Sequence, residues 1–499
     1  MLDLGKSVIK NNHRTFYETV REDGKFISIL IIIATLLFIF ISFAYPIMPG
    51  LAIGTYLDSC HGTSNGMRML GSVFALCHLL EMNDITISII LYLLYLTHIL
   101  AVYYIGSYFG TLIARLFSFI ILCHVQIAVL FHTVGSEMLV CIVLSLLVAF
   151  TFRVHQSERY LSVILVAILT FLMTLFRPEY IVYAAIGVYP VFCRIKESII
   201  DRIKYSLVYF TCIVFLASGY SIYNYFNSSF LGLVNGVGQM NFSNMFPSRS
   251  LFNINPMLDE KNGPASKQLF AIVKEDLLNG EEYMLCEKHV IRAKGFFTSK
   301  YEMNWSDMIN EVERQAPGQN LIFKASMEAI QRSPINYILG SWVFPMFHLA
   351  HVKTDFYLPI DQPSPVTDHR PLPNGGGSIT PSQESTKSPE HTAEIMVQKM
   401  QKQQGNYHAA FFLKYSLFDL IPPIAYFMFF SVFIIFSKSK AHLVLLSTLL
   451  PSYLIFFLYS QLSIHSRLRL PYDFIFILSG ILGAIIFLDK IKSIIYNKN

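Results

Sequence analysis

The stretch FISILIIIATLLFIFISFAYPIM, residues 26–48, decides the fold class because it contains no charged residue. A bilayer core about 30 Å thick is crossed by a helix of about 20 apolar residues. A secretory signal peptide has a shorter apolar region and a small-residue cleavage site. Residues 26–48 are therefore predicted to form a first transmembrane helix. The polar segment before them carries Lys6, Lys10, Arg14, Arg21 and Lys25.

The composition of the whole chain points to the same class. Of 499 residues, 54% are hydrophobic and 14% are charged, and the mean hydropathy is +0.48. A soluble globular protein has roughly 25% charged residues. The net charge of +5 comes from scattered basic residues, which excludes a nucleic-acid partner. The seven cysteines contain no CxxC pair, so they indicate neither a disulfide framework nor a metal cage.

Further apolar segments have the composition of membrane spans. They are residues 85–108, 111–133, 136–153, 160–176, 180–193, 205–226, 415–436, 443–460 and 471–488. The chain is therefore predicted to be an all-α polytopic membrane protein with about ten transmembrane helices.

Basic residues in short connections predict the orientation, because such connections stay in the cytoplasm. The basic ones here are the N-terminal segment, 153–159, 194–204, Lys438 with Lys440, and the tail 490–498. The connections 49–84, 132–136, 177–179, 227–414 and 461–470 then lie outside. Residues 336–351 are apolar but short and broken by Pro345, and counting them as a span would place Lys438 outside. They are therefore predicted to form an interfacial or re-entrant helix.

Five regions follow from this topology. Residues 353–408 are rich in Pro, Gly and Ser and cannot bury enough apolar surface to offset the entropy of ordering. We expect them to be flexible. The regions are a cytoplasmic segment 1–25, a transmembrane catalytic module 26–226 with a first external loop 49–84, an external helical region 227–352, the flexible segment 353–408, and a C-terminal transmembrane module with a cytoplasmic tail, 409–499.

Ionisable residues beside the spans gather on the predicted external side. Such residues are informative because a charge at mid-membrane costs roughly 2.5–3.5 kcal/mol on insertion scales. The residues are Asp58, His61, Arg68, His132, Glu137, Arg177, Glu179, His465, Arg467 and Arg469.

Each of these residues also has a purely structural interpretation. Arg177 and Glu179 flank a proline and could form an ion pair at a helix end. Glu137 begins a predicted helix, where a carboxylate complements the helix dipole. Arg467 and Arg469 could lay the aliphatic part of their side chains along the membrane and keep their guanidinium groups in water. The histidines could pack in the core, and Asp58 could be solvated.

Taken together, the residues suit chemistry on a lipid phosphate. Arginines at the outer leaflet can bind a phosphate through bidentate hydrogen bonds. A nearby aspartate can accept the proton of an attacking hydroxyl or amine, a role worth roughly 10²–10⁴-fold in rate. A phosphate leaves well once its charge is stabilised.

Several short motifs occur in an order that resembles a known family. They are Asp58-Ser59-Cys60-His61, Ser136-Glu137, Arg177-Pro178-Glu179, Tyr223-Asn224-Tyr225, Ser333-Pro334-Ile335-Asn336-Tyr337 and Arg467-Leu468-Arg469-Leu470-Pro471. The chain resembles the GT-C superfamily of membrane glycosyltransferases, in the branch of lipid A aminoarabinose transferases and protein O-mannosyltransferases. Tyr223 stands where that branch usually has Arg, and the last motif lacks a Tyr.

The resemblance implies an inverting transfer of a monosaccharide from a polyprenyl-phosphate or dolichyl-phosphate donor. Asp58 would be the general base. Arg177, Arg467 and Arg469 would bind the donor phosphate. The residues that would orient these groups or meet sugar or acceptor are Glu179, Glu137, His61, Asn224 and His465. Some relatives use a divalent metal, but the chain offers few outer carboxylates, so no cofactor is expected.

Two other functions stay open. A polymerase or ligase of lipid-linked glycans would also need arginines near a lipid pyrophosphate. A transporter would carry ionisable groups at mid-bilayer and a repeated half, and no repeat is visible. The acceptor could be a lipid, a glycan or a protein. The cysteine pattern favours the bacterial inner membrane over the endoplasmic reticulum, with the active site extracytoplasmic.

Overall fold

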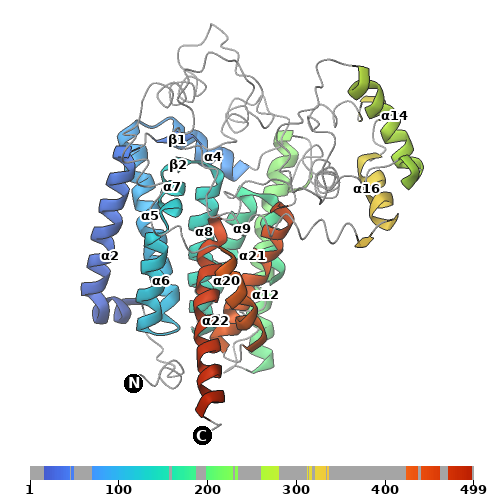
Figure 1. Ribbon diagram of the computed structural model, residues 1–499. Helices are drawn as coiled ribbons and strands as arrows, with labels where there is room; N and C mark the ends of the chain where they lie inside the picture. The colour runs from blue at the N-terminus through green and yellow to red at the C-terminus, as the bar shows by residue number, and fades with distance from the viewer. Residues whose placement is uncertain are drawn as a thin grey trace.

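The computed structural model describes the helical part of the chain and leaves other segments out. The described residues are 16–44, 47–49, 70–156, 160–186, 198–228, 231–233, 260–279, 312, 314–316, 321–332, 334–335, 423–436, 440–460 and 470–496. The predicted helix 336–351 and the segment 353–408 lie outside them. The described chain is a bundle of long helices with two further helices, α14 and α16, beside its upper end (Figure 1).

The helices of the bundle follow the apolar segments of the sequence. Their bounds are α2 Phe16–Ala44, α5 Asp84–Ser107, α6 Thr111–Cys123, α7 Val125–Phe131, α8 Ser136–Gln156, α9 Tyr160–Phe176, α10 Val182–Ile186, α12 Ile199–Ser228, α20 Pro423–Phe436, α21 Lys440–Ser460 and α22 Leu470–Tyr496. The upper end of the bundle in Figure 1 is the end where α8 and α22 begin and α9 ends.

Five of these helices are long and apolar enough to cross a membrane: parts of α2, α5, α8, α12 and α22. The pair α6 and α7 makes a sixth candidate, bent by 67° at His124. Large apolar side chains stay exposed on the outer faces, among them Phe43, Phe215 and Phe226. Exposed apolar surface on this scale is typical of a lipid-facing protein. The described part of the chain is thus almost entirely helical, as in an all-α multi-pass membrane protein, and the count of ten spans stays a prediction.

The first helix begins at Phe16, well before the predicted start of the span. Asp23 interrupts it, with φ −117° and ψ 22°. The side chain of Asp23 is buried, and its carboxylate accepts hydrogen bonds from Nε of Arg115 at 2.9 Å and from the phenol of Tyr103 at 2.6 Å. Helix α2 therefore includes residues 16–25, which were predicted to belong to a cytoplasmic segment before the transmembrane helix.

A short apolar helix, α4 (Leu70–Leu80), lies within the predicted first external loop. Gly71 allows α4 to approach α9 closely, since a Cβ there would lie 2.8 Å from Cβ of Leu175. This helix was not predicted from the sequence. The segment 180–193 also differs: it begins as a 3₁₀ turn, η1 (Pro178–Ile181), and continues as α10.

The two helices beside the bundle form a small unit of their own. The 3₁₀ turn η2 (Glu260–Asn262) leads into α14 (Pro264–Asn279), which packs against α16 (Leu321–Arg332). Glu328 accepts hydrogen bonds from the amides of Ala265 and Ser266, at 3.0 and 2.7 Å. The carboxylate of one helix therefore caps the first turn of the other.

Candidate functional site

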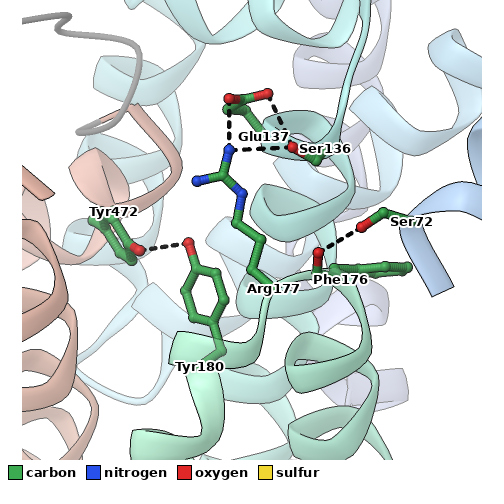
Figure 2. Close-up of polar contacts among 7 residues, drawn as sticks. All are labelled: Ser72, Ser136, Glu137, Phe176, Arg177, Tyr180 and Tyr472. Atoms are coloured by element: carbon green, nitrogen blue, oxygen red, sulfur yellow. Dashed lines mark hydrogen bonds and ion pairs between the residues drawn. The ribbon is translucent and has the colours of Figure 1, made fainter. Parts of the chain in front are cut away.

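An ion pair joins the start of α8 to the end of α9. Nη2 of Arg177 donates to Oε1 of Glu137 at 2.8 Å and to Oγ of Ser136 at 3.2 Å (Figure 2). The side chains of Arg177 and Glu137 are 15% and 10% exposed. Glu137 lies in the first turn of α8, where the helix dipole also favours a negative charge. The structure therefore brings two of the predicted site residues together, and Nη2 of the guanidinium makes both contacts with α8.

Two tyrosines connect this ion pair to α22. The hydroxyls of Tyr180, in η1, and Tyr472, in the first turn of α22, lie 2.5 Å apart (Figure 2). One turn further, the hydroxyl of Tyr183 lies 2.6 Å from Oγ of Ser452 on α21. All four side chains are buried. These residues could not be predicted from the sequence, because a tyrosine in an apolar segment looks like an ordinary core residue.

The described elements on both sides of the segment that carries Asp58 and His61 contact residues next to the same ion pair. Before it, β1 (Met48–Pro49) pairs in parallel with β2 (Thr133–Val134), directly ahead of Ser136. After it, Oγ of Ser72 on α4 donates to the carbonyl of Phe176 at 2.5 Å, next to Arg177 (Figure 2). Asp58 and His61 themselves lie outside the described residues.

Several of the other predicted residues, or their side chains, lie outside the described part of the chain. His465, Arg467 and Arg469 lie outside the described residues, and Leu470, which follows Arg469 in the chain, opens α22. Glu179 belongs to η1, but its side chain is outside the described set.

Two further residues have described contacts with other parts of the chain. Asn224, near the end of α12, donates from Nδ2 to the carbonyl of Gly232 at 2.7 Å. His132 is buried and packs edge-on against Phe38, with ring centroids 5.6 Å apart.

A second polar cluster, which the sequence analysis did not predict, lies within the bundle. Nε2 of His124, at the break between α6 and α7, is 3.3 Å from Oδ2 of Asp473 in the first turn of α22. Sγ of Cys141 on α8 lies 3.8 Å from Nδ1 of His98 on α5. In sequence, His98 and Cys141 sit inside apolar runs, and only their polarity there could have drawn attention to them.

The cysteines give one correction. Cys77, on α4, is disulfide-bonded, whereas Cys123, Cys141 and Cys212 are free thiols. The spacing of the cysteines predicted no disulfide framework, and the bond at Cys77 shows that at least one disulfide forms without such a pattern. Spacing could not reveal this bond, because connectivity depends on which loops meet.

Among the residues that the structure describes, no group of three or more His, Cys, Asp or Glu side chains is arranged to hold a metal ion. The expectation that no cofactor is needed stays a prediction. No protein-family model, curated protein or solved structure matches this chain.

Proposed function

We propose that this protein is a glycosyltransferase that moves a monosaccharide from a polyprenyl-phosphate or dolichyl-phosphate donor to an acceptor on the extracytoplasmic side. One observation carries the proposal: the described ends of the Asp58 segment and the first turn of α22 both adjoin the Glu137–Arg177 pair. Asp58, Arg467 and Arg469 belong to segments that start or end at this point, although they are far apart in sequence.

In the proposed reaction the acceptor oxygen or nitrogen forms a bond to the anomeric carbon of the sugar. The bond from that carbon to the phosphate oxygen breaks, and polyprenyl phosphate leaves with the electron pair. Asp58 takes the proton of the acceptor. Arg177, Arg467 and Arg469 stabilise the negative charge on the phosphate, and Glu137 holds Arg177 in place.

The disulfide at Cys77 supports the extracytoplasmic orientation of this end. Disulfides form in the periplasm, the endoplasmic reticulum lumen and outside the cell, and are rare in the cytosol. Because α4 carries Cys77 and contacts α9 beside Arg177, the proposed site and the disulfide share one side of the membrane. The cysteines therefore no longer favour the bacterial inner membrane over the endoplasmic reticulum, because disulfides form both in the periplasm and in the endoplasmic reticulum lumen.

A transfer assay tests the proposal. Purified protein given labelled polyprenyl-phosphate sugar and acceptor should release free polyprenyl phosphate. Asp58→Ala should reduce turnover by about 10²-fold or more, and Arg467→Ala should mainly raise the KM for the donor. Glu81→Gln, which changes an exposed carboxylate just after α4, is the matched control. Normal turnover by the Asp58 variant would remove the base assignment. Use of an oligosaccharide on a pyrophosphate carrier instead would support a polymerase or ligase.

A transporter is a second candidate, because the bent pair α6 and α7 and the buried His124–Asp473 contact have the form of substrate sites in transporters. Uptake of labelled solute into proteoliposomes, with no covalent change to it, would favour this function over glycosyl transfer.

A further inference from the structure

Arg202, in the first turn of α12, carries a charge that the described part of the chain does not neutralise. Its Nε atom is buried, and its guanidinium has no hydrogen bond or ion pair with any residue that the structure describes. The adjacent carboxylate of Asp201 accepts instead from Oγ of Ser198 at 2.7 Å and from Nζ of Lys204 at 3.2 Å. Since a guanidinium is always charged in proteins, one edge of Arg202 is left without the acceptor that burial calls for.

Ser206, one turn further along α12, has a buried hydroxyl that also finds no partner among the described residues. In a helix, a serine hydroxyl can donate to the carbonyl three or four residues earlier. In the apolar helices of this protein Ser42, Ser118 and Ser452 do so, at 3.0, 2.8 and 2.7 Å. Ser206 makes no such bond, so its hydroxyl stays available to an acceptor outside the helix.

The two donors lie on one side of α12. Residues four apart in a helix are neighbours on its surface, with about 5–6 Å between their Cβ atoms. Side chains in a helix lean toward its N-terminus, so the side chain of Ser206 leans toward the turn that carries Arg202. A single phosphate can therefore accept from Nε of Arg202 through one oxygen and from Oγ of Ser206 through another.

The two donors also lie at the boundary between the packed side of α12 and its outer side. On the packed side, Tyr205 is buried, and its ring centroid lies 4.5 Å from that of Tyr160 on α9. On the outer side, Ile203 and Leu207 are one turn apart and are 54% and 65% exposed. An acyl chain can lie along these two side chains while its headgroup reaches the donors. The boundary thus offers both parts of a phospholipid a matching surface.

This part of α12 lies at the opposite end of the bundle from Arg177. Helix α9 begins at Tyr160 and ends at Phe176, next to Arg177, and its 17 residues are about 25 Å long. Because Tyr205 packs on Tyr160, the start of α12 lies beside the start of α9. In the proposed orientation this end faces the cytoplasm, where the leaflet carries anionic lipids and basic pockets between helices bind their headgroups.

We propose that Arg202 and Ser206 bind the phosphate headgroup of an anionic phospholipid in the cytoplasmic leaflet. Nε of Arg202 and Oγ of Ser206 donate to the phosphate oxygens, and an acyl chain lies along Ile203 and Leu207. The lipid is a structural ligand that joins the start of α12 to the surrounding leaflet, and no covalent bond forms or breaks. The glycosyl transfer proposed at the Arg177 end makes no use of these residues, so the lipid site stands whatever reaction occurs there.

Native mass spectrometry of the full-length protein is the first test, with dioleoylphosphatidylglycerol and dioleoylphosphatidylcholine titrated separately. The first phosphatidylglycerol should bind at least about tenfold more tightly than phosphatidylcholine, whose choline offsets the phosphate charge. In the double variant Arg202→Gln/Ser206→Ala this preference should fall to about threefold or less. Lys492→Gln is the matched control, because it removes one exposed positive charge at the end of α22 and leaves both donors in place. An unchanged preference in the double variant, or an equal loss in the control, would overturn the proposal.

The second test uses the wild-type protein, so it stands even where the double variant fails to fold. A phosphatidylglycerol carrying a photoreactive diazirine beside its headgroup is added to lipid nanodiscs, and crosslinked peptides are identified by mass spectrometry. Crosslinks to residues 199–207 should be at least about threefold more frequent than with the matching phosphatidylcholine probe. Equal labelling by the two probes would contradict the lipid site.

Inorganic phosphate distinguishes a lipid headgroup from a free anion at the same donors. Millimolar phosphate should leave the crosslinks in place, because it lacks the acyl chain that Ile203 and Leu207 contact in the proposed complex. Loss of the crosslinks at that concentration would assign the donors to free phosphate and would overturn the lipid proposal.

Discussion

Arg177 carries a largely buried positive charge, which two side chains of α8, Glu137 and Ser136, contact. The removal of both ions from water is costly, and their attraction offsets this cost only with good geometry and further hydrogen bonds. The pair therefore adds little net stability, but its disruption is expensive because one charge would stay buried without its counter-ion. At the scale of single residues, Glu137 is thus a positioning residue whose effect acts through Arg177.

Glu137→Ala should lower the free energy of unfolding by about 3–5 kcal/mol, the usual cost of removing one partner of a buried pair. Glu137→Gln should cost less, because an amide oxygen still accepts a hydrogen bond from the guanidinium. Thermal unfolding followed with a thiol-reactive dye measures both, since Cys123, Cys141 and Cys212 are free. Adding Arg177→Ala to Glu137→Ala should recover part of the loss. If the two single losses simply add, the residues are not coupled.

Close helix contacts in the bundle depend on glycine. A Cβ on Gly483 would collide with the backbone of Phe429, so α22 meets α20 through its backbone at this position. Gly106 plays the same part between α5 and α6, where a Cβ would lie 2.8 Å from Cα of Ala114. Small residues at helix interfaces are typical of membrane proteins, in which packing rather than the hydrophobic effect joins helices.

Gly483→Ala should separate α20 from α22 and lower the Tm by several degrees, because the obstructing atoms belong to a backbone that cannot rotate away. Gly219→Ala is the matched control: this glycine lies inside α12, and nothing is within 4 Å of the position of its Cβ. The control should be neutral or stabilising by about 0.5–1 kcal/mol, as alanine is the better helix former. Equal Tm values for the two variants would show that the contact at Gly483 is not required.

The cap of α14 gives a prediction for acid pH. Burial raises the pKa of Glu328, but the hydrogen bonds from Ala265 and Ser266 outweigh it, so the pKa lies below its usual value. The stabilisation is then complete above about pH 4.3, the ordinary value for Glu, and is lost as the pH falls through the lower value of the folded state.

Hydrogen exchange of the peptide 264–272, corrected for the intrinsic rate at each pH, should report this loss as weaker protection in acid. Glu328→Gln should show weaker protection already at pH 7, because the charged acceptor is gone. Lys324→Gln changes an exposed residue of the same helix and should leave protection unchanged. Protection that is the same in the wild type and in Glu328→Gln would refute the cap.

The whole molecule has two chemically different ends. At the upper end lie the disulfide-bonded Cys77, the Glu137–Arg177 pair and the start of α22. At the opposite end α22 finishes with Lys490 and Lys492, and Lys490 lies 3.8 Å above the ring of Phe436. Basic residues at one end and an oxidised cysteine at the other agree with a cytoplasmic location for the end of α22.

Single cysteines at exposed positions test this orientation. Lys267→Cys on α14 should react with a membrane-impermeant thiol reagent in intact cells, whereas Lys492→Cys at the end of α22 should react only after permeabilisation. Peptide mapping identifies the labelled site in each case. The reverse pattern would place the Arg177 end in the cytosol and would exclude the proposed extracytoplasmic transfer.

The sequence by itself determined the class of protein and the approximate positions of the helices. The charge-free run 26–48 and the later apolar segments are local properties of the chain, and the bilayer thickness converts them into helix lengths. Local composition also predicts that the segment 353–408 is separate from the apolar bundle, but this segment lies outside the described residues. The start of α2 was misjudged because the helix there continues through Asp23, whose charge Arg115 satisfies from far along the chain.

Only the tertiary structure decided which polar groups meet. Glu137 and Arg177 were both predicted as site residues, yet their contact depends on how α8 packs against α9. Tyr180 with Tyr472, and His124 with Asp473, join positions hundreds of residues apart that look like ordinary core in sequence. A buried polar group needs a partner, but the sequence does not say which one; the packing of the helices makes that choice.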